Sequence, residues 1–297
     1  MFKIKRLAII SDIHGNYIAL EQFLEDIKKY NVDYIIASGD LVNEFPFGRE
    51  VIKLIKDNNI IAVKGNREEY LINLDKYKYN WENIQFRNTR FMYNQLTKED
   101  MDFIKQLPMT VSMDVEDLKI KVVHASPESI FEFIHEDDIE LMEKYAKQIK
   151  EDILIFGHSH QRIWERKVFG KTFINAGCAG VSTLNPNYIE YSLLTVNGSE
   201  ATLEKRNIPM DVARLKKELS DSGLIEVEKT FVNLSFLGIT GDRKIIKSFF
   251  AKAKEKMIEE HRSMIKPDAN GIYATFRLFD DDVWVELTKE YEKYFVL

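Results

Sequence analysis

Residues 6–16 read Arg-Leu-Ala-Ile-Ile-Ser-Asp-Ile-His-Gly-Asn, an apolar run joined directly to polar and turn-forming residues. The apolar part, residues 6–10, is typical of a buried strand. Apolar residues then recur at three- and four-residue spacing through residues 18–27, which is the pattern of an amphipathic helix. The stretch therefore predicts a strand, a polar loop and a helix in succession, with Asp12 and His14 in the loop.

The same order of elements recurs further along the chain. A strand predicted at residues 34–37 leads to Gly39-Asp40, and one at residues 60–63 leads to Gly65-Asn66, with an amphipathic helix at residues 51–56 between them. This alternation is typical of an α/β fold, in which helices cover parallel strands. Ligands of such folds bind beyond the carboxyl ends of the strands, which is where these polar residues stand.

Further strands are predicted in the second half of this region. Those at residues 119–123 and 153–156 end in His124 and in Gly157-His158-Ser159-His160. Hairpins follow, and Asn197-Gly198 is a strong type I′ turn signal. We expect the hairpins to form a second, more antiparallel sheet of the same domain; they pair residues 163–168 with 171–174, and 188–196 with 201–206.

Pro209 marks a predicted domain boundary, with a main domain at residues 1–209 and an accessory region at residues 210–297. The accessory region carries no motif of known chemistry. A substrate lid, a regulatory module and an arm that forms a homodimer all remain open for it. Its predicted elements are helices at 211–221 and 244–261 and strand-like stretches at 230–237 and 272–279.

The composition excludes several classes of protein. With 45% hydrophobic residues, the 297-residue chain is not disordered, and a net charge of −6 argues against a nucleic-acid scaffold. No apolar run approaches the roughly 20 residues of a membrane span, so we expect a cytoplasmic protein without a membrane partner. The single cysteine, Cys178, excludes an intrachain disulfide and a cysteine-based zinc site.

Nitrogen- and oxygen-donor side chains follow five separate predicted strands. Each alone has a structural reading, because Asp and Asn cap turns and a lone His is usually a satisfied polar group. Together they predict a two-metal site, since imidazole, carboxylate and amide groups suit first-row transition metals. The proposed ligands are Asp12, His14, Asp40, Asn66, His124, His158 and His160. His135 and His261 lack this context, and we interpret them as surface residues.

These blocks resemble, in residue type, order and spacing, the five motifs of the calcineurin-like metallophosphoesterases over about residues 5–206. The resemblance implies an α/β fold, a four-layer α-β-β-α sandwich, with residues 1–209 as the catalytic domain. It does not cover the tail after Pro209, whose predicted helices and strand-like stretches describe a smaller α+β extension. It also implies two ligand sets joined by a bridging Asp40. One set would be Asp12, His14 and His160, and the other Asn66, His124 and His158.

Two further segments resemble particular branches of this family. Asn175-Ala176-Gly177-Cys178 is similar to a segment of bacterial small phosphodiesterases, and the loop at residues 124–128 to one found in asymmetric diadenosine tetraphosphate hydrolases. The implied activity is hydrolysis of a phosphodiester or phosphoanhydride by a metal-bridging hydroxide, on a small phosphorylated substrate such as a nucleotide. A dinucleoside polyphosphate hydrolase, a protein phosphatase and a non-catalytic scaffold are the alternatives.

Two divalent ions are expected, with Mn²⁺ favoured and Fe, Zn²⁺ or Ni²⁺ as alternatives. Their four charges, less those of Asp12, Asp40 and a hydroxide, leave one positive charge, which weakly favours a diester monoanion.

Many family members have a proton-donating histidine where this chain has Arg67, which stays protonated and cannot donate. We assign Asn66 and Arg67 catalytic roles, and Arg67 and Asn16 substrate contacts; the alternative for Arg67 is a surface ion pair.

Four phenylalanines lie in loops that flank the ligand blocks. Phe45, Phe47, Phe131 and Phe133 could stack on a base, a contact of roughly 1–3 kcal/mol per base. The alternative, that they pack these loops onto the body of the protein, is favoured.

Overall fold

A computed structural model describes residues 3–74, 83–259 and 279–297. Ten of their strands form two five-stranded sheets. The first sheet has the order β10-β9-β1-β2-β3 and the second β4-β5-β6-β8-β7. The first comprises β1 (Lys5–Ile10), β2 (Tyr34–Ala37), β3 (Ile61–Ala62), β9 (Tyr188–Asn197) and β10 (Glu200–Pro209). The second comprises β4 (Thr110–Val115), β5 (Leu118–Val123), β6 (Ile153–Phe156), β7 (Trp164–Val168) and β8 (Lys171–Asn175).

Parallel strands form the centre of each sheet, as the sequence predicts. Strands β1, β2 and β3 are parallel, and so are β5, β6 and β8. The hairpins do not form a separate antiparallel sheet, so that expectation was wrong. Strand β9 pairs with β1, Leu194 opposite Leu7, and thereby extends the first sheet, whereas β7 and β8 extend the second.

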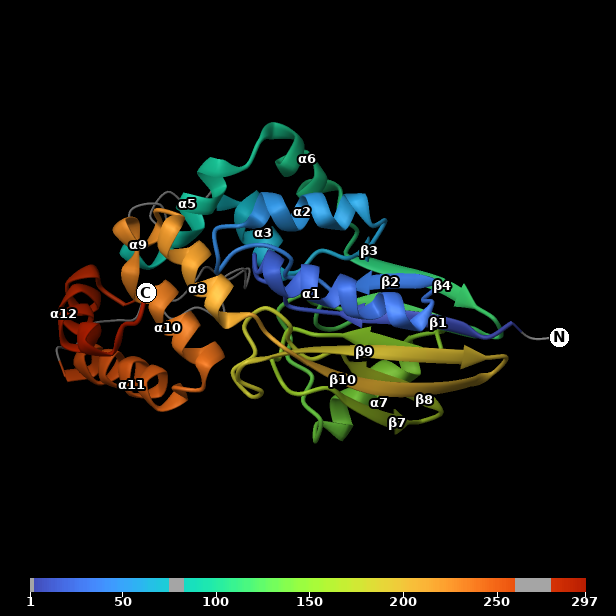
Figure 1. Cartoon of the computed structure of the whole chain (residues 1–297). Helices are drawn as coiled ribbons and strands as arrows, with labels where there is room; N and C mark the ends of the chain where they lie inside the picture. The colour runs from blue at the N-terminus through green and yellow to red at the C-terminus, as the bar shows by residue number, and fades with distance from the viewer. Residues whose placement is uncertain (1–2, 75–82, 260–278) are drawn as a thin grey trace.

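Helices cover the outer faces of the two sheets and complete the predicted four layers (Figure 1). On the first sheet, α1 (Tyr17–Ile27) and α2 (Gly48–Asp57) pack apolar side chains against β1 and β2. On the second, α7 (Ile139–Gln148) packs against β6 and β8. Leu7, Ile9 and Ile120 belong to the apolar layer between the sheets. The sandwich fold is thus confirmed.

Short helices connect β3 to β4 along the edge of the first sheet. Thr97 caps one of them, because its hydroxyl accepts the Asp100 N–H and Asp100 accepts the Thr97 N–H. Residues 75–82 of this connection lie outside the described residues. The helices are α3 (Asn66–Ile72), η3 (Ile84–Phe86), α5 (Arg87–Gln95) and α6 (Lys98–Gln106), and η1 (Lys28–Tyr30) ends α1.

The described part of the accessory region is helical, and it lies at the end of the sandwich opposite the N-terminus (Figure 1). The strand-like prediction for residues 230–237 was wrong, because they lie within a helix. The other strand-like stretch and His261 fall largely outside the described residues. The helices are α8 (Val212–Asp221), α9 (Leu224–Val227), α10 (Lys229–Thr240), α11 (Arg243–Glu259), α12 (Asp281–Tyr291) and η4 (Glu292–Tyr294).

The accessory helices pack in two different ways. Leu215, Leu219 and Leu224 are fully buried in the same cluster as α1 and α2. In contrast, Phe249 and Trp284 belong to a separate cluster formed by α10, α11 and α12. The boundary at Pro209 and the dimer both stay predictions. Within the described ranges, no helix combines the length and apolar character that a membrane crossing needs.

Candidate metal centre

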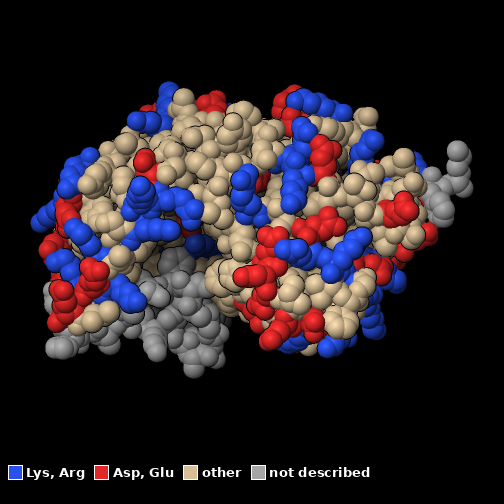
Figure 2. Space-filling view, turned by 90° about the horizontal axis from the view of Figure 1, so that it is seen from below, with Lys and Arg blue, Asp and Glu red and all other residues tan. Residues whose placement is uncertain are grey.

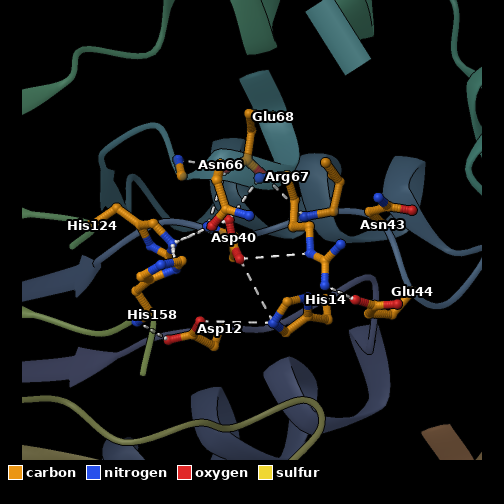
Figure 3. Close-up of polar contacts among 12 residues, drawn as sticks. Asp12, His14, Asp40, Asn43, Glu44, Asn66, Arg67, Glu68, His124 and His158 are labelled. Carbon is orange, nitrogen blue, oxygen red and sulfur yellow. Dashed lines mark hydrogen bonds and ion pairs between the residues drawn. The ribbon is translucent and has the colours of Figure 1, made fainter. Parts of the chain in front are cut away.

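All seven proposed ligands lie at one edge of the sandwich, beyond the carboxyl ends of the parallel strands. Asp12 and His14 follow β1, Asp40 follows β2 and Asn66 follows β3. The other three come from the second sheet, after β5 and β6. The structure therefore brings together side chains from both sheets, and Figure 3 shows Asp40 between the imidazoles of His14 and His124.

The first group of ligand atoms comes from Asp12, His14, Asp40 and His160, and these atoms lie within 4.8 Å of one another. The Nε2 atom of His14 is 3.0 Å from Nε2 of His160 and 3.8 Å from Oδ2 of Asp40. Oδ1 of Asp12 is 3.3 Å from Nε2 of His160. The four side chains therefore point at a common position.

The second group comes from Asp40, His124 and His158, again within 4.8 Å. Nε2 of His124 is 3.2 Å from Nδ1 of His158 and 3.3 Å from Oδ1 of Asp40. Oδ1 of Asn66 lies 2.9 Å from the same His124 nitrogen. Asp40 belongs to both groups, with one oxygen toward each.

These buried groups fit divalent cations. Imidazole nitrogens that face one another and face carboxylate oxygens are a transition-metal donor set. Oδ1 of Asp12, which belongs to the first group, is buried without a hydrogen-bond partner, and such an orphaned polar atom needs an explanation. Burial and the nearby His124 lower the pKa of His158 to about 3, so its imidazole is neutral and has a lone pair to offer.

Asp12 is held as a carboxylate. Burial raises the pKa of its carboxyl, but the contacts with His14 and His160 outweigh that effect and hold the pKa well below its usual range. Its Oδ2 also accepts hydrogen bonds from the Ser11 hydroxyl at 2.6 Å and from the His158 N–H at 3.0 Å. These bonds leave Oδ1 directed at the site.

A second layer of contacts orients the ligands. His124 Nδ1 lies 2.9 Å from the Ser38 carbonyl oxygen, which fixes the tautomer that leaves Nε2 free to face the site. The buried Glu68 carboxylate accepts the N–H groups of Asp40, Leu41, Val42 and Gly65. Glu68 thereby ties the loop after β2 to the loop after β3. Burial and the nearby charge of Asp40 raise the pKa of the Glu68 carboxyl to about 7.

Two glycines let the loops approach this closely. A Cβ at Gly65 would lie 2.2 Å from Oδ1 of Asp40, and a Cβ at Gly157 would lie 2.4 Å from Oδ2 of Asp12. Neither position could hold a larger residue without moving a proposed ligand. The glycines of the Gly65-Asn66 and Gly157-His158 motifs are therefore part of the geometry of the site.

Arg67 lies in the site and not on the surface, so its surface alternative was wrong. Its guanidinium forms an ion pair with Glu44, and its Nε lies 3.9 Å from Oδ2 of Asp40. Its backbone N–H donates to Oδ1 of Asp40 at 2.9 Å. Glu44 in turn lies 3.9 Å from Nδ1 of His14. Arg67 and Glu44 thus form a charged pair beside the proposed ligands.

Asn16 lies elsewhere, and the structure does not support it as a substrate contact. Its Oδ1 accepts the Ala19 N–H and caps α1, and its Nδ2 donates to the Gly180 carbonyl at 2.9 Å. It is fully buried and does not line the cavity described below. Cys178 is also buried, in reach of His14 and His160, and burial raises the pKa of its thiol.

The sequence left two roles open for the four loop phenylalanines, stacking on a base and packing of the loops onto the body, and the structure distinguishes among the four. Phe45 and Phe47 are buried in the main cluster, as the packing alternative expects. Phe131 stacks on Tyr70, with ring centroids 6.1 Å apart. Phe133 differs, because it is 39% exposed and stacks on His158 with ring centroids 4.3 Å apart. His135 is exposed, as expected.

Sequence reasoning missed two residues of the site. Glu68 carries a readable signal, because a Glu three residues after Gly65 is the third position of a capping box, where its carboxylate reaches back to the backbone. Glu44 carries no such signal, since its role depends on the loop after β2 folding back toward Arg67.

Comparison with known proteins is consistent with this geometry. The model of the calcineurin-like phosphoesterase superfamily domain matches residues 6–199. An uncharacterized protein of Methanocaldococcus jannaschii is 28% identical over 158 residues, which is 52% of this chain and 62% of that relative. The chain thus spans less than two thirds of that relative's length. A phosphodiesterase of the same archaeon is 28% identical over 183 residues, which is 60% of this chain and 87% of that protein.

A solved structure shares the fold. The metallophosphoesterase from Sphaerobacter thermophilus superposes with a TM-score of 0.59 and 22% identity, over 79% of this chain and 99% of its own. The superposition therefore extends past the span of the family model, into the accessory region.

Proposed function

This chain belongs to the calcineurin-like phosphoesterase superfamily, and from that premise we propose that it hydrolyses phosphodiester or phosphoanhydride bonds with two divalent cations. The observation that carries the proposal is the position of Asp40, whose carboxylate belongs to both groups of converging ligand atoms. A carboxylate shared between two such groups can hold two cations close together. The similarity to an archaeal phosphodiesterase also supports diesters as substrates.

In this proposal each cation has its own ligands from both sheets. Asp12, His14 and His160 hold one, Asn66, His124 and His158 hold the other, and Asp40 contacts both. We propose Mn²⁺, with Fe, Zn²⁺ and Ni²⁺ as alternatives for this donor set. When bound, the cations supply Lewis-acid stabilisation of the phosphoryl oxygens and a water of lowered pKa.

The charge around the site supports a substrate with a single negative charge. Arg67 alone would add one positive charge and so favour a dianionic monoester. The Glu44 carboxylate, paired with the guanidinium, cancels that charge. Two divalent cations with Asp12, Asp40 and a hydroxide then leave about one positive charge, which matches a phosphodiester.

Arg67 is proposed to orient the phosphate and not to protonate the leaving group. A guanidinium presents several N–H donors in a fixed plane, which suits phosphate oxygens. It remains protonated at neutral pH and has no proton to give. We therefore propose substrates whose leaving groups need no acid, such as an activated ester or a phosphate in an anhydride.

Hydrolysis of bis(p-nitrophenyl) phosphate with added Mn²⁺ tests the proposal. The wild-type chain should turn over this diester, and Asp40→Asn should lower kcat at least 1,000-fold and reduce the Mn²⁺ bound per chain. Asp33→Asn is the control, because Asp33 pairs with Lys5 on the surface. If saturating Mn²⁺ gives no turnover, or if Asp40→Asn retains activity and bound metal, the proposal is wrong and a non-catalytic scaffold is favoured.

A further inference from the structure

A cavity of about 580 Å³ adjoins the proposed metal ligands and is lined by residues of the sandwich and of the accessory helices. Its floor is polar and contains Asp40, Asn66, Arg67 and His158. Its walls are largely apolar and come from α10, α11 and the segment leading into α12. Figure 2 shows this face of the molecule hollowed between the accessory helices and the sheets.

Two adjacent phenylalanines on α11 have different environments. Phe249 is fully buried and packs its ring against Trp284, with centroids 5.0 Å apart. Phe250 is 36% exposed and lines the cavity. Phe279 and Trp284 line it as well, with their rings stacked at 6.4 Å. Phe279 and Trp284 are only 2% and 1% exposed, so Phe250 supplies more exposed aromatic surface to this cavity than either of them.

The sandwich also contributes an aromatic ring to the lining of the cavity. Phe133 is exposed and lies flat against the imidazole of His158, at an interplanar angle of 17°. A large apolar side chain that stays exposed beside a buried polar centre has a ready use as a stacking surface. Exposed aromatic rings from both the sandwich and the accessory helices therefore line the cavity above its polar floor.

The part of the walls that the structure describes has few groups that could pair with a second charged group of a ligand. Among the described residues that line the cavity, Arg67 is the single Lys or Arg, and Glu44 already pairs with it. Gln85 uses its amide to donate to the Phe279 carbonyl at 2.7 Å. A chain of several phosphates would leave its charges against apolar walls, whereas a flat ring would bury apolar surface there.

We propose that the accessory helices form a specificity wall, and that this cavity binds phosphoesters with one phosphate and an organic arm that carries an aromatic ring. The inference rests on the proposed phosphoesterase function, because the floor residues are assigned to the phosphate. A nucleoside and a simple aryl or benzyl group are the two sources of such a ring. The cavity volume lies within the roughly 300–1,000 Å³ of small-ligand sites.

Three diesters with the same leaving group test the wall. Methyl, benzyl and thymidine 5′-p-nitrophenyl phosphate differ only in the retained arm, so kcat/KM with Mn²⁺ reports how the arm is bound. We expect kcat/KM to be at least tenfold higher for a ring-bearing arm than for methyl. Phe250→Ala and, from the sandwich, Phe133→Ala should each reduce that ratio at least threefold. Phe169→Ala is the matched control, because Phe169 is 63% exposed and does not line the cavity.

The possible results test the proposed specificity wall independently of the proposed phosphoesterase activity. A ratio that neither variant changes, with all three diesters hydrolysed, overturns the wall and leaves the phosphoesterase intact. A higher kcat/KM for diadenosine tetraphosphate than for the ring-bearing diesters also overturns it. A preference for thymidine over benzyl supports a nucleoside arm, and the reverse supports a simple aryl-bearing arm.

If no diester is hydrolysed, the catalytic proposal fails. A binding measurement then tests separately whether the accessory helices select an aromatic ring. Titration calorimetry with benzyl phosphate and methyl phosphate then compares affinities in the wild-type chain and in Phe250→Ala. Tighter binding of benzyl phosphate that is lost in the variant supports the wall, and equal binding overturns it.

Discussion

Five of the proposed ligands have left-handed backbone, a conformation that side chains other than glycine rarely adopt. Asp12, His14, Asp40, His158 and His160 have φ between 50° and 64°. Each such residue costs roughly 1–2 kcal/mol. Strain of this kind persists where the surroundings impose it, and it clusters at functional sites. At Asp12, His14 and Asp40, backbone hydrogen bonds join the loops after β1 and β2 and hold this conformation, which supports a functional centre independently of residue type.

The proposed role of Arg67 predicts how the rate depends on the leaving group. Arg67→His places a group that can donate a proton near neutral pH beside the phosphate. We expect this change to raise kcat/KM for diesters with poor alkoxide leaving groups relative to p-nitrophenolate, by roughly tenfold or more. Rates for a series of leaving groups check it. Arg67→Lys is the control, and an unchanged dependence on leaving-group pKa in Arg67→His would contradict the role.

Glu44 sets the charge that the phosphate meets. Glu44→Gln removes one negative charge beside Arg67 and His14, so a dianionic substrate should gain more than a monoanionic one. We expect the kcat/KM ratio of p-nitrophenyl phosphate to its methyl diester to rise roughly tenfold. Steady-state kinetics at fixed Mn²⁺ measure the ratio, with Glu128→Gln on the surface as control. A constant ratio would show that Glu44 does not tune substrate charge.

At the scale of elements, the ends of the strands could be predicted from the sequence because short local patterns determine them. An apolar run followed by Gly and a polar residue predicts a strand and its turn, and parallel strands bring such turns to one edge. Helix α10 was not readable, because Val232, Leu234 and Phe236 alternate as in a strand. The deciding contact is Glu228, whose carboxylate accepts backbone N–H groups at the start of the helix. Burial on several sides of α10 hides the helical period.

Glu228 gives α10 a pH-dependent stability. Burial raises the pKa of this carboxyl from 4.5 to about 7. The folded chain therefore binds more protons than the unfolded chain between these values, and the free energy of unfolding falls as the pH rises through that window. Glu228→Gln should remove this contribution, on the order of 3 kcal/mol across the window. Denaturant unfolding at pH 5 to 8 measures it.

The control for that experiment is Glu226→Gln, an exposed position two residues earlier. It should leave the pH dependence of the unfolding free energy as in the wild-type chain. Parallel curves for Glu228→Gln and the wild type would mean that Glu228 is charged in the folded state at all of these pH values.

For the whole molecule, the cavity depends on elements far apart in the sequence. Its floor lies at the ends of strands from both sheets, and its walls lie on α10, α11 and the start of α12. The resemblance carried by the motifs extends over about residues 5–206, so it predicted the floor. It could not predict the walls, because Phe250 and Trp284 have the spacing of ordinary core residues and reach the cavity through the packing of α11 against α12.

The boundary at Pro209 has a consequence for folding. Leu215, Leu219 and Leu224 are fully buried against the first-sheet helices, and burial of a leucine contributes roughly 2 kcal/mol. Their loss, on the order of 6 kcal/mol, is comparable to the total stability of a typical domain. A chain of residues 1–209 should therefore unfold at a much lower temperature than the full chain or fail to remain soluble. A chain that ends at Gly241 keeps these leucines and should be clearly more stable than residues 1–209. Thermal unfolding of the three chains measures the difference, and an unchanged Tm for residues 1–209 would instead establish an independent domain that ends at Pro209.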